Sequence, residues 1–284
     1  MGRRAVLGWT GAALGVGVVT ACTSTADRSE PTVASATPTP PATVTELLRT
    51  EGFMVAHRGG SRSWPEMTEV AYDHAVDAGL RALEVSVHRT SDGVFVCCHD
   101  PSTLRVTGVD HVIAQTPWAD LQPLKVTAKR TTDPGQPDAA FTQLETVLEA
   151  HAADRVIVLE DKSYAHGAAL LERVRAIPGH EERVVWKVHG PSGDRAVALG
   201  AEAGLRTFGY FFPANLEAFA QKAPRFDIVG IDVECTDDQI RAAVDVGKPV
   251  LAHVIASTAE RDRMLDLGCR GLMVADVRAL TSGS

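Results

Sequence analysis

Polar and ionisable side chains follow four short apolar runs in this chain of 284 residues. The four sets are His57-Arg58, Glu84-Val85-Ser86, His99-Asp100 and Glu160-Asp161-Lys162. Histidine titrates near neutral pH, so one imidazole can take a proton from a nucleophilic hydroxyl while another protonates the leaving oxygen. We therefore predict that His57 and His99 form an acid–base pair.

The remaining side chains of these sets suit a phosphodiester substrate. Its phosphate needs cationic partners, which Arg58 and Lys162 can supply. A hard divalent cation, Mg2+ or Ca2+, held by Glu84 and Glu160 would neutralise the charge that develops on the phosphoryl oxygens. The two glutamates also have a purely structural interpretation, as buried carboxylates paired with nearby cations and no metal.

These groups can act together only if the fold brings the ends of the runs to one place. Side chains alternate along a strand, so Glu84 and Ser86 share one face and the valine between them faces the other way. Valine suits a face covered by helices, which predicts that Glu84 and Ser86 point inward. The same alternation directs Glu160 and Lys162 together and turns Asp161 away.

Short apolar runs alternate with helical periodicity over about 240 residues, which is typical of an α/β fold with a parallel sheet and outer helices. This length suits one (β/α)8 TIM barrel, whose active site forms at the carboxyl ends of the strands. An open doubly wound sheet is the alternative, but no glycine-rich fingerprint follows the first strand. The predicted strands are Phe53–His57, Ala82–Val87, Val94–His99, Arg155–Glu160, Arg183–Val188, Thr207–Phe211, Ile228–Val233, Val250–Val254 and Gly271–Val274. The predicted helices cover residues 65–78, 142–152, 165–176, 192–203, 214–221, 236–246 and 257–267.

Two segments depart from a regular barrel. There are nine strand-like runs for eight positions, so we expect one run to lie outside the barrel. The link between Val87 and Val94 is too short for a helix, and we expect extended chain that returns along the barrel. Residues 101–141 have turn signals and little periodicity. A loop of that length is usually functional, and we expect it to overhang the mouth of the barrel.

The order and spacing of these residues resemble the glycerophosphodiester phosphodiesterase family, a group of PLC-like phosphodiesterase TIM barrels. The resemblance covers nearly all of the predicted folded part, residues 44–284. It is carried by His57-Arg58-Gly59-Gly60, Trp64-Pro65-Glu66, Ala82-Leu83-Glu84-Val85-Ser86, Thr90-Ser91-Asp92-Gly93, His99-Asp100-Pro101, Leu159-Glu160-Asp161-Lys162 and Gly271-Leu272-Met273-Val274-Ala275-Asp276.

The resemblance implies a barrel that lacks a helix between strands 2 and 3. It also implies metal-dependent hydrolysis of glycerophosphodiesters, or related phospholipid headgroup phosphodiesters, to an alcohol and glycerol phosphate. His57 and His99 match the family's catalytic pair, and Glu84, Ser86 and Glu160 match its metal ligands. Attack by a hydroxyl of the substrate, which would give a cyclic phosphate, is a variant that the sequence does not separate from hydrolysis.

Ser86 departs from the family pattern, which has Glu-x-Asp at this place. Serine is neutral and a weak ligand, so the predicted metal site loses one negative charge. Glu66 or Asp232 could replace it. Glu66 has two further interpretations, as a substrate-binding residue and as a carboxylate favoured by the dipole at a helix start. The alternative function is a phosphodiester-binding lipoprotein whose catalysis is weakened or lost through Ser86.

Several other residues have weaker signals. Lys187 and His189 follow a predicted strand and could contact the substrate. The segment around His253 lacks the tryptophan that many family members carry there, so substrate contacts could differ. Four other histidines fall on helices or loops and are predicted to be surface residues: His74, His88, His151 and His180.

The beginning of the chain predicts export. Arg3 and Arg4 precede an apolar run that is too short for a membrane span and resembles a secretory or twin-arginine signal. The run ends at Cys22 in a sequence that resembles a lipoprotein cleavage box. We expect a signal peptide over 1–22 and lipid anchoring through Cys22 at the outer face of a bacterial cell membrane, or else secretion.

Composition narrows the remaining possibilities. Residues 23–43 are rich in threonine, serine, proline and alanine, which predicts an extended tether. A net charge of -8 argues against sequence-independent nucleic-acid binding, so the expected partner is a small or lipid-derived phosphodiester. Cys97 and Cys98 are neighbours in an apolar run, where packing in the core is the expected role for at least one of them.

Overall fold

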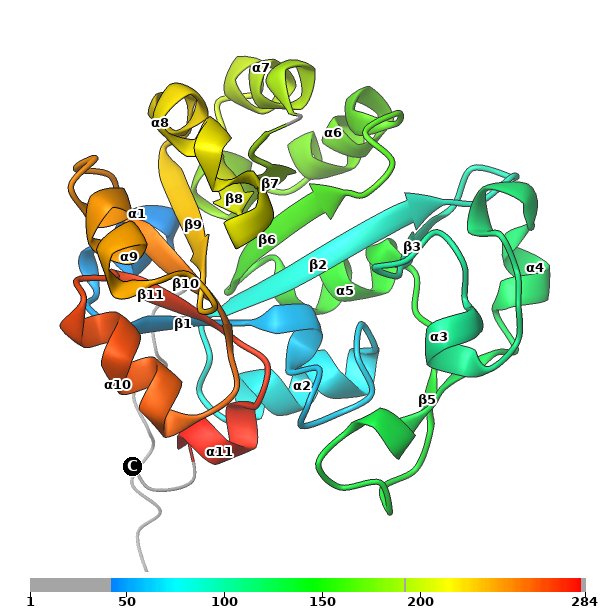
Figure 1. Ribbon diagram of the computed structural model, residues 1–284. Helices are drawn as coiled ribbons and strands as arrows, with labels where there is room; N and C mark the ends of the chain where they lie inside the picture. The colour runs from blue at the N-terminus through cyan, green and yellow to red at the C-terminus, as the bar shows by residue number, and fades with distance from the viewer. Residues whose placement is uncertain (1–41, 192, 282–284) are drawn as a thin grey trace, which may run out of the picture. The chain divides into compact units, whose positions relative to one another are not determined.

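Eight parallel strands form a closed barrel in the computed structural model, which describes residues 42–191 and 193–281 (Figure 1). Each strand pairs with its neighbours in chain order, and the last pairs with the first, which confirms the predicted (β/α)8 barrel. The barrel strands are β1 (Phe53–Ala56), β2 (Ala82–Arg89), β6 (Val156–Asp161), β7 (Val184–His189), β8 (Arg206–Phe211), β9 (Ile228–Asp232), β10 (Val250–Ile255) and β11 (Gly271–Val274).

Helices cover the outside of the barrel (Figure 1). They are α2 (Glu69–Asp77), α5 (Leu144–His151), α6 (Gly167–Arg175), α7 (Asp194–Glu202), α8 (Phe219–Lys222), α9 (Asp237–Val244), α10 (Thr258–Asp266) and α11 (Val277–Thr281). The predicted helix over 214–221 is wrong in type, because most of it is the 3-10 helix Pro213–Ala218, whose first residue is a proline. Helix α2 begins at Glu69, after the N-cap Thr68, and so later than the predicted residue 65.

The alternation of side chains along the strands divides the barrel into two apolar layers. Outward residues such as Val85 of β2 and Leu159 of β6 pack with the helices. Inward residues such as Val158 and Phe208 fill the amino-terminal half of the interior. The polar residues of the same inward rows therefore lie at the opposite, carboxyl end, where a TIM barrel builds its site.

A short helix that the sequence did not predict, α1 (Val44–Arg49), closes the amino-terminal end of the barrel. Val44 and Leu47 pack against inward side chains of the strands. The hydroxyl of Thr43 caps the helix by accepting from the backbone N–H of Glu46 at 3.1 Å. Ala42 is buried in the same cluster, so the ordered domain includes the last residues of the predicted tether.

The ninth strand-like run is β3 (Phe95–Cys97), and it lies outside the closed barrel. It pairs antiparallel with the end of β2, with Val87 opposite Cys97 and Arg89 opposite Phe95. No helix lies between β2 and β3, as expected, but the idea of extended chain returning along the barrel is wrong. The link is a hairpin turn, which needs only a few residues to join two antiparallel strands.

Residues 101–141 form an ordered insertion beyond the carboxyl end of β2 (Figure 1). It carries the short helices α3 (Leu104–Thr107) and α4 (Trp118–Leu121) and the two-stranded sheet of β4 (Lys125–Val126) and β5 (Ala139–Ala140). Residues from the insertion and from β3 share an apolar cluster of their own: Val96, Cys98, Val106, Ile113, Leu121, Val126 and Phe141. The insertion is thus a small packed unit, and its contribution to the site is described below.

Close packing on the outer layer makes one glycine a sensitive position. A methyl group at Gly209 of β8 would lie 2.4 Å from the ring of Phe226, too close for any real contact. We expect Gly209→Ala to destabilise the fold by about 1–3 kcal/mol through overpacking. The matched control is Gly135→Ala in the insertion, where the nearest atom is the Asp133 carboxylate at 3.5 Å. Urea unfolding of both variants tests this, and equal midpoints would contradict it.

Several predictions about the ends and the cysteines can be placed. The predicted signal peptide, Cys22 and residues 23–41 of the tether lie outside the described residues, so export and lipid anchoring stay predictions. Within the described ranges, no helix is both long and apolar enough to cross a membrane. The four cysteines of the folded part are buried free thiols: Cys97, Cys98, Cys235 and Cys269.

Candidate active site

His57 lies in a tight turn directly after β1. This 3-10 turn (His57–Gly59) includes Arg58 in the left-handed region, with φ 55°, and ends at Gly60 with φ 97°. The backbone N–H of Arg58 donates to Glu84 Oε2 at 2.8 Å, which ties the turn to β2. His57 is mostly buried, and its Nδ1 lies 3.3 Å from the Ser61 hydroxyl. The turn thus holds the imidazole at the carboxyl end of the barrel.

His99 lies just past β3, and two neighbours hold it. Its Nδ1 is 2.7 Å from Asp100 Oδ1, and its carbonyl oxygen is 3.2 Å from His88 Nε2. His88 was predicted to be a surface residue, but it lies on the inward row of β2 and is only 8% exposed. That prediction is wrong because β2 continues past Val87 to Arg89. His88 thereby supports the segment that presents His99.

An ion-pair network extends from His99 into the insertion. Arg105, at the start of α3, donates to Asp100 through Nε and to both oxygens of Glu66 at 2.9 and 2.7 Å. Glu66 also accepts from Arg58 Nη1 at 3.2 Å. Both oxygens of Glu66 are therefore engaged by arginines, and its interpretation as a carboxylate in the first turn of a helix is wrong, because α2 begins at Glu69.

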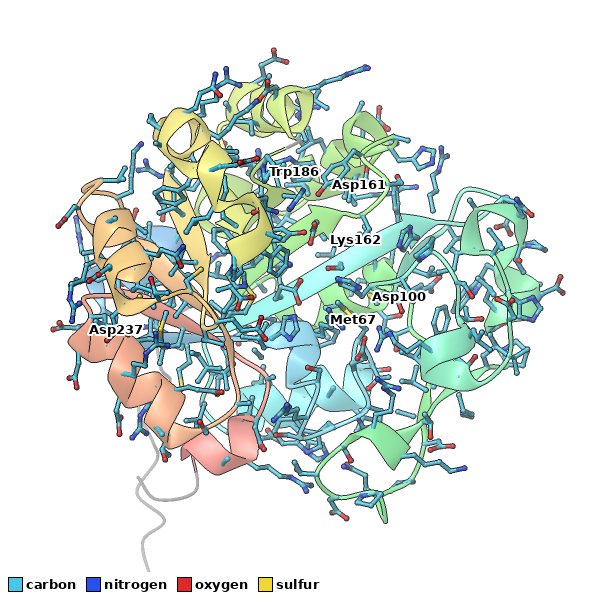
Figure 2. The ribbon with its side chains drawn as sticks, viewed as in Figure 1. Met67, Asp100, Asp161, Lys162, Trp186 and Asp237 are labelled. Atoms are coloured by element: carbon cyan, nitrogen blue, oxygen red, sulfur yellow. The ribbon has the colours of Figure 1, made fainter. Side chains whose placement is uncertain are left out.

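The prediction that Glu84 and Ser86 point into the barrel, and that Glu160 and Lys162 point the same way as each other, is confirmed. Glu84, Ser86 and Glu160 are fully buried inside the barrel, where the Ser86 hydroxyl lies 2.9 Å from Glu84 and 3.4 Å from Glu160. Lys162 follows on the same row, with Nζ 3.2 Å from Glu160 Oε1. Figure 2 labels Lys162 after β6 and Asp100 after β3, both near the end of the barrel to which the strands point. Asp161 faces the other way and accepts from the backbone N–H groups of Ser163 and His166.

A lysine lies between the two glutamates. Lys187, on the inward row of β7, places Nζ 2.7 Å from Glu84 Oε1 and 2.9 Å from Glu160 Oε2. Its ammonium also lies 4.8 Å from the ring centre of Tyr210, whose hydroxyl donates to Glu160 at 2.8 Å. The sequence offered Lys187 only as a possible substrate contact, because nothing local to β7 reveals its two acidic partners.

The charges of this cluster hold one another in their ionised forms. Burial would raise the pKa of Glu160, but Lys187 and Lys162 outweigh it and lower that pKa to about 2. Burial likewise opposes ionisation of Glu84, yet Lys187 keeps the pKa of that carboxyl well below its usual range. Burial would lower the pKa of Lys187, and the two carboxylates raise it instead. Lys187 is therefore a permanent cation at neutral pH.

A cavity of about 410 Å³ opens above this cluster. Its floor and walls carry His57 and His99, the predicted acid–base pair, together with cationic and aromatic side chains, whereas the fully buried carboxylates lie beneath. The lining residues are His57, Arg58, His99, Lys162, Tyr164, Lys187, His189, Tyr210, Phe212, His253, Val254 and Met273. Lys187 and His189 thus line the cavity, as the sequence suggested, and an entering ligand meets ammonium groups before it meets any carboxylate.

Several lining residues were not predicted. Tyr210 and Phe212 lie on the inward row at the end of β8, and His253 lies on that of β10, with Nδ1 3.5 Å from Asp232. The alternation of side chains that places Glu84 inside the barrel also places Tyr210 and His253 there. Tyr164 lies on the loop after β6 and donates to Glu160 at 3.2 Å, a contact without a sequence signal.

The donor set fits a divalent metal poorly. Within the residues described here, no group of three or more histidine, cysteine or acidic side chains is arranged to hold an ion. Ser86 donates a hydrogen bond where the family pattern has a carboxylate, and the ammonium of Lys187 occupies the space between the other two predicted ligands, Glu84 and Glu160. Neither proposed replacement fills the gap: the oxygens of Glu66 bind arginines, and Asp232 accepts from the backbone N–H of Glu234 at 2.8 Å.

The other histidines divide between surface and interior. His74 is exposed and stacks on Trp64 at 5.3 Å, as a surface residue can, and His180 is half-buried beside Glu181. The prediction that His151 lies at the surface is wrong: it is 6% exposed, and its Nε2 lies 3.3 Å from Asp73 Oδ1. It is the last residue of α5, and its ring centre lies 6.4 Å from that of the buried Tyr72.

Comparison with known proteins finds a similarity to one family of phosphodiesterases. Residues 57–185 match the sequence model of the glycerophosphoryl diester phosphodiesterase family. A probable glycerophosphodiester phosphodiesterase 1 from Mycobacterium tuberculosis is 29% identical over 139 residues, which are 46% of this chain and 51% of that protein. A lysophospholipase D from Rattus norvegicus is 33% identical over 190 residues, which are 61% of this chain and 60% of that protein. The chain thus spans about half the length of the first relative and three fifths of the second.

Solved structures share the fold. A putative glycerophosphoryl diester phosphodiesterase from Silicibacter pomeroyi superposes with a TM-score of 0.67 at 22% identity, covering 84% of this chain and 96% of that one. A phosphodiesterase from Oleispira antarctica, solved with the product sn-glycerol-3-phosphate, has a TM-score of 0.67 at 20% identity, with 82% and 98% covered. Over its segment 57–185 this chain is thus similar to the glycerophosphoryl diester phosphodiesterase family, and it shares the barrel fold of the two solved structures.

Proposed function

We propose that this protein hydrolyses glycerophosphodiesters, or related phospholipid headgroup phosphodiesters, to an alcohol and glycerol phosphate. The observation that carries the proposal is the cavity that presents His57 and His99 together with Arg58, Lys162 and Lys187. A phosphodiester is an anion whose cleavage needs cations at the phosphate and two proton-transfer groups. The relatives named above support the same reaction class.

The cationic floor would hold the phosphate. Within the described structure, Arg58 Nε is buried without a hydrogen-bond partner although Arg58 lines the cavity. A buried donor left unpaired costs free energy, so a phosphate oxygen that accepts from it would be bound favourably. Arg58 is in turn oriented by Glu66, which gives Glu66 a positioning role in substrate binding.

The two imidazoles would divide the proton transfers. Burial, and to a smaller extent the positive charge of Arg58, holds the pKa of His57 well below its usual value. His57 is therefore neutral and suited to take the proton of the attacking water. His99 donates through Nδ1 to the carboxylate of Asp100, a contact that favours its imidazolium form and suits it to protonate the leaving alkoxide. Water thereby forms the new P–O bond as the bond to the leaving alcohol breaks.

A phosphorus NMR assay tests the reaction. The purified full chain is incubated with glycerophosphocholine, and the expected product signal is that of a glycerol phosphate monoester. A cyclic phosphate signal would instead assign the nucleophile to a substrate hydroxyl. The alternative function, a phosphodiester-binding protein, would show calorimetric binding of glycerophosphocholine without either product.

The pH dependence follows from the two histidines. Burial lowers the pKa of His57, and burial together with Arg58 and Lys162 lowers that of His99, both from a usual value of about 6.5. The base acts above its own pKa and the acid acts below its own. Because both values are lowered, we expect kcat/KM, which reports the free enzyme, to be greatest on the acid side of pH 6.5. A pH–rate profile with a maximum above pH 7 would contradict these assignments.

A further inference from the structure

We propose that the ammonium of Lys187 takes the place of a divalent cation, so that this barrel cleaves its phosphodiester without a metal. The inference rests on the proposed function for its catalytic part, while its metal-binding part can be tested independently. It concerns the four residues that face one another at the centre of the site: Lys187, Ser86, Glu84 and Glu160.

Geometry is the first argument. The ammonium lies 2.7 Å from Glu84 Oε1 and 2.9 Å from Glu160 Oε2, so one cation bridges carboxylates on two different strands. The register pairs Ser86 with Glu160 and places Glu84 two residues earlier on the same strand. An ion held by these two carboxylates would have to occupy the space that the ammonium fills.

The hydrogen bonds of the carboxylates are the second argument. Oε2 of Glu84 accepts from the backbone N–H of Arg58 at 2.8 Å. Oε1 accepts from the Ser86 hydroxyl and from the Lys187 ammonium. The Glu160 oxygen that does not face Lys187 accepts from the Tyr210 hydroxyl at 2.8 Å. Each of the four oxygens thus has a donor from the protein, and a metal would have to displace at least two of these bonds.

Charge is the third argument. Two buried carboxylates carry two negative charges, which Lys187 and Lys162 balance within 3.2 Å. A divalent cation would add two uncompensated positive charges to a fully buried cluster, which is unfavourable. An aspartate at position 86 would have changed this balance, but serine leaves it intact. Ser86 and Lys187 are therefore complementary: a neutral side chain at the first position and an ammonium at the second leave the charges of the cluster balanced.

Access to the substrate is the fourth argument. An ammonium has three N–H donors, and two of those of Lys187 point at the carboxylates. Lys187 also lines the cavity, with 6% of its surface exposed, and its third donor is left for a phosphate that enters there. There it can neutralise developing charge on a phosphoryl oxygen from a fixed position, as preorganised donors do.

The first experiment uses the unmodified full chain. Mn2+ is titrated against it and free Mn2+ is followed by electron paramagnetic resonance, while hydrolysis of glycerophosphocholine is measured with and without EDTA. We expect no stoichiometric Mn2+ binding and equal rates with and without the chelator. Tight binding of one Mn2+ per chain, or a rate that EDTA abolishes and Mg2+ restores, would overturn the proposal.

The second experiment rebuilds a metal site. Ser86→Asp/Lys187→Met removes the ammonium and adds a third carboxylate, whereas the matched Ser86→Ala/Lys187→Met removes the ammonium and the Ser86 hydroxyl without adding a carboxylate. We expect the first double variant to bind one Mn2+ at least about tenfold more tightly than the second, since added ligand charge tunes such sites over decades. Equal affinities, with both variants folded by circular dichroism, would show that Ser86 and Lys187 do not occupy the cation site.

The activity of single variants tests the catalytic role of Lys187 separately from its exclusion of a metal. We expect Lys187→Met to lower kcat by about 10²–10³-fold, the usual effect of removing one donor to a developing oxyanion, and Lys187→Arg to retain part of the rate. Full activity of a folded Lys187→Met would overturn the role of the ammonium. If the unmodified chain turns over no phosphodiester, the proposed function fails, but the Mn2+ titrations still decide whether Lys187 excludes a metal.

Discussion

Replacing His57 with asparagine is expected to lower kcat for glycerophosphocholine by about 10²–10⁴-fold, the range associated with loss of a general acid or base. The imidazole lies in the turn after β1 and lines the cavity with His99. KM should change little, because Arg58, Lys162 and Lys187 hold the phosphate and remain in place. Initial rates under saturating substrate measure the effect.

His99→Asn should produce a loss of the same order, and the double variant should lose little more than either single one, because an acid and a base in one step act as a unit. The matched control is His111→Asn, a change of the same chemistry on the insertion at a half-buried histidine away from the cavity lining. Retention of the full rate by a folded His57→Asn protein would refute the assignment of the base.

Removing the cation from the buried cluster is expected to have the largest effect on stability. Lys187→Met leaves Glu84 and Glu160 facing each other inside the barrel without the ammonium that bridges them. Breaking a buried ion pair in this way costs about 3–5 kcal/mol. For a domain of this size each kcal/mol lowers Tm by about 2–4 °C, so we expect a fall of about 6–20 °C, measured by scanning calorimetry.

Two comparisons give this prediction its control. Lys162→Met removes a cation from the same glutamate, but from a side chain that is 15% exposed, so it should cost less. Glu84→Gln/Lys187→Met removes one charge of each sign and should recover part of the loss. A Tm for Lys187→Met within 2 °C of the unmodified protein would mean that the carboxylates do not depend on the ammonium.

Acid should weaken the same cluster in the unmodified protein. The pKa of Glu160 is lowered to about 2 in the folded state, against about 4.3 for an unfolded glutamate. A lowered folded-state pKa contributes stability above the unfolded value, and this contribution is lost as the pH falls from about 4 toward 2. Lys187→Met lacks most of this contribution and should therefore lose less stability over the same interval.

The strands and the facing of their side chains could be predicted because alternation has a period of two and needs only local sequence. Glu84, Ser86 and Glu160 were placed inside the barrel by that rule, and they lie there. The rule gives a face but no direction. The run that became β3 is apolar in either orientation, and only its pairing with β2 makes it antiparallel.

The partners of the site residues could not be predicted in the same way. Lys187 lies 103 positions from Glu84 along the chain, and its role depends on the closure of the barrel rather than on any motif around it. Arg105 belongs to a segment without periodicity, so nothing in its surroundings indicated that it would bind Glu66 and Asp100. Sequence patterns identified the ionisable residues of the site. The distances between them, which set their charge states, depend on contacts between distant parts of the chain.

The ion pairs of Arg105 have a consequence for how such a barrel can diversify. One histidine of the pair stands on the turn after β1, whereas the carboxylate beside the other is held by a residue of the insertion. The insertion has an apolar cluster of its own, so its sequence can drift without repacking the strands. A change at Arg105 would act on Asp100 beside His99 and, through Glu66, on the orientation of Arg58. A single residue outside the barrel strands is therefore placed to tune the acidity of one histidine and the position of a cavity-lining cation together.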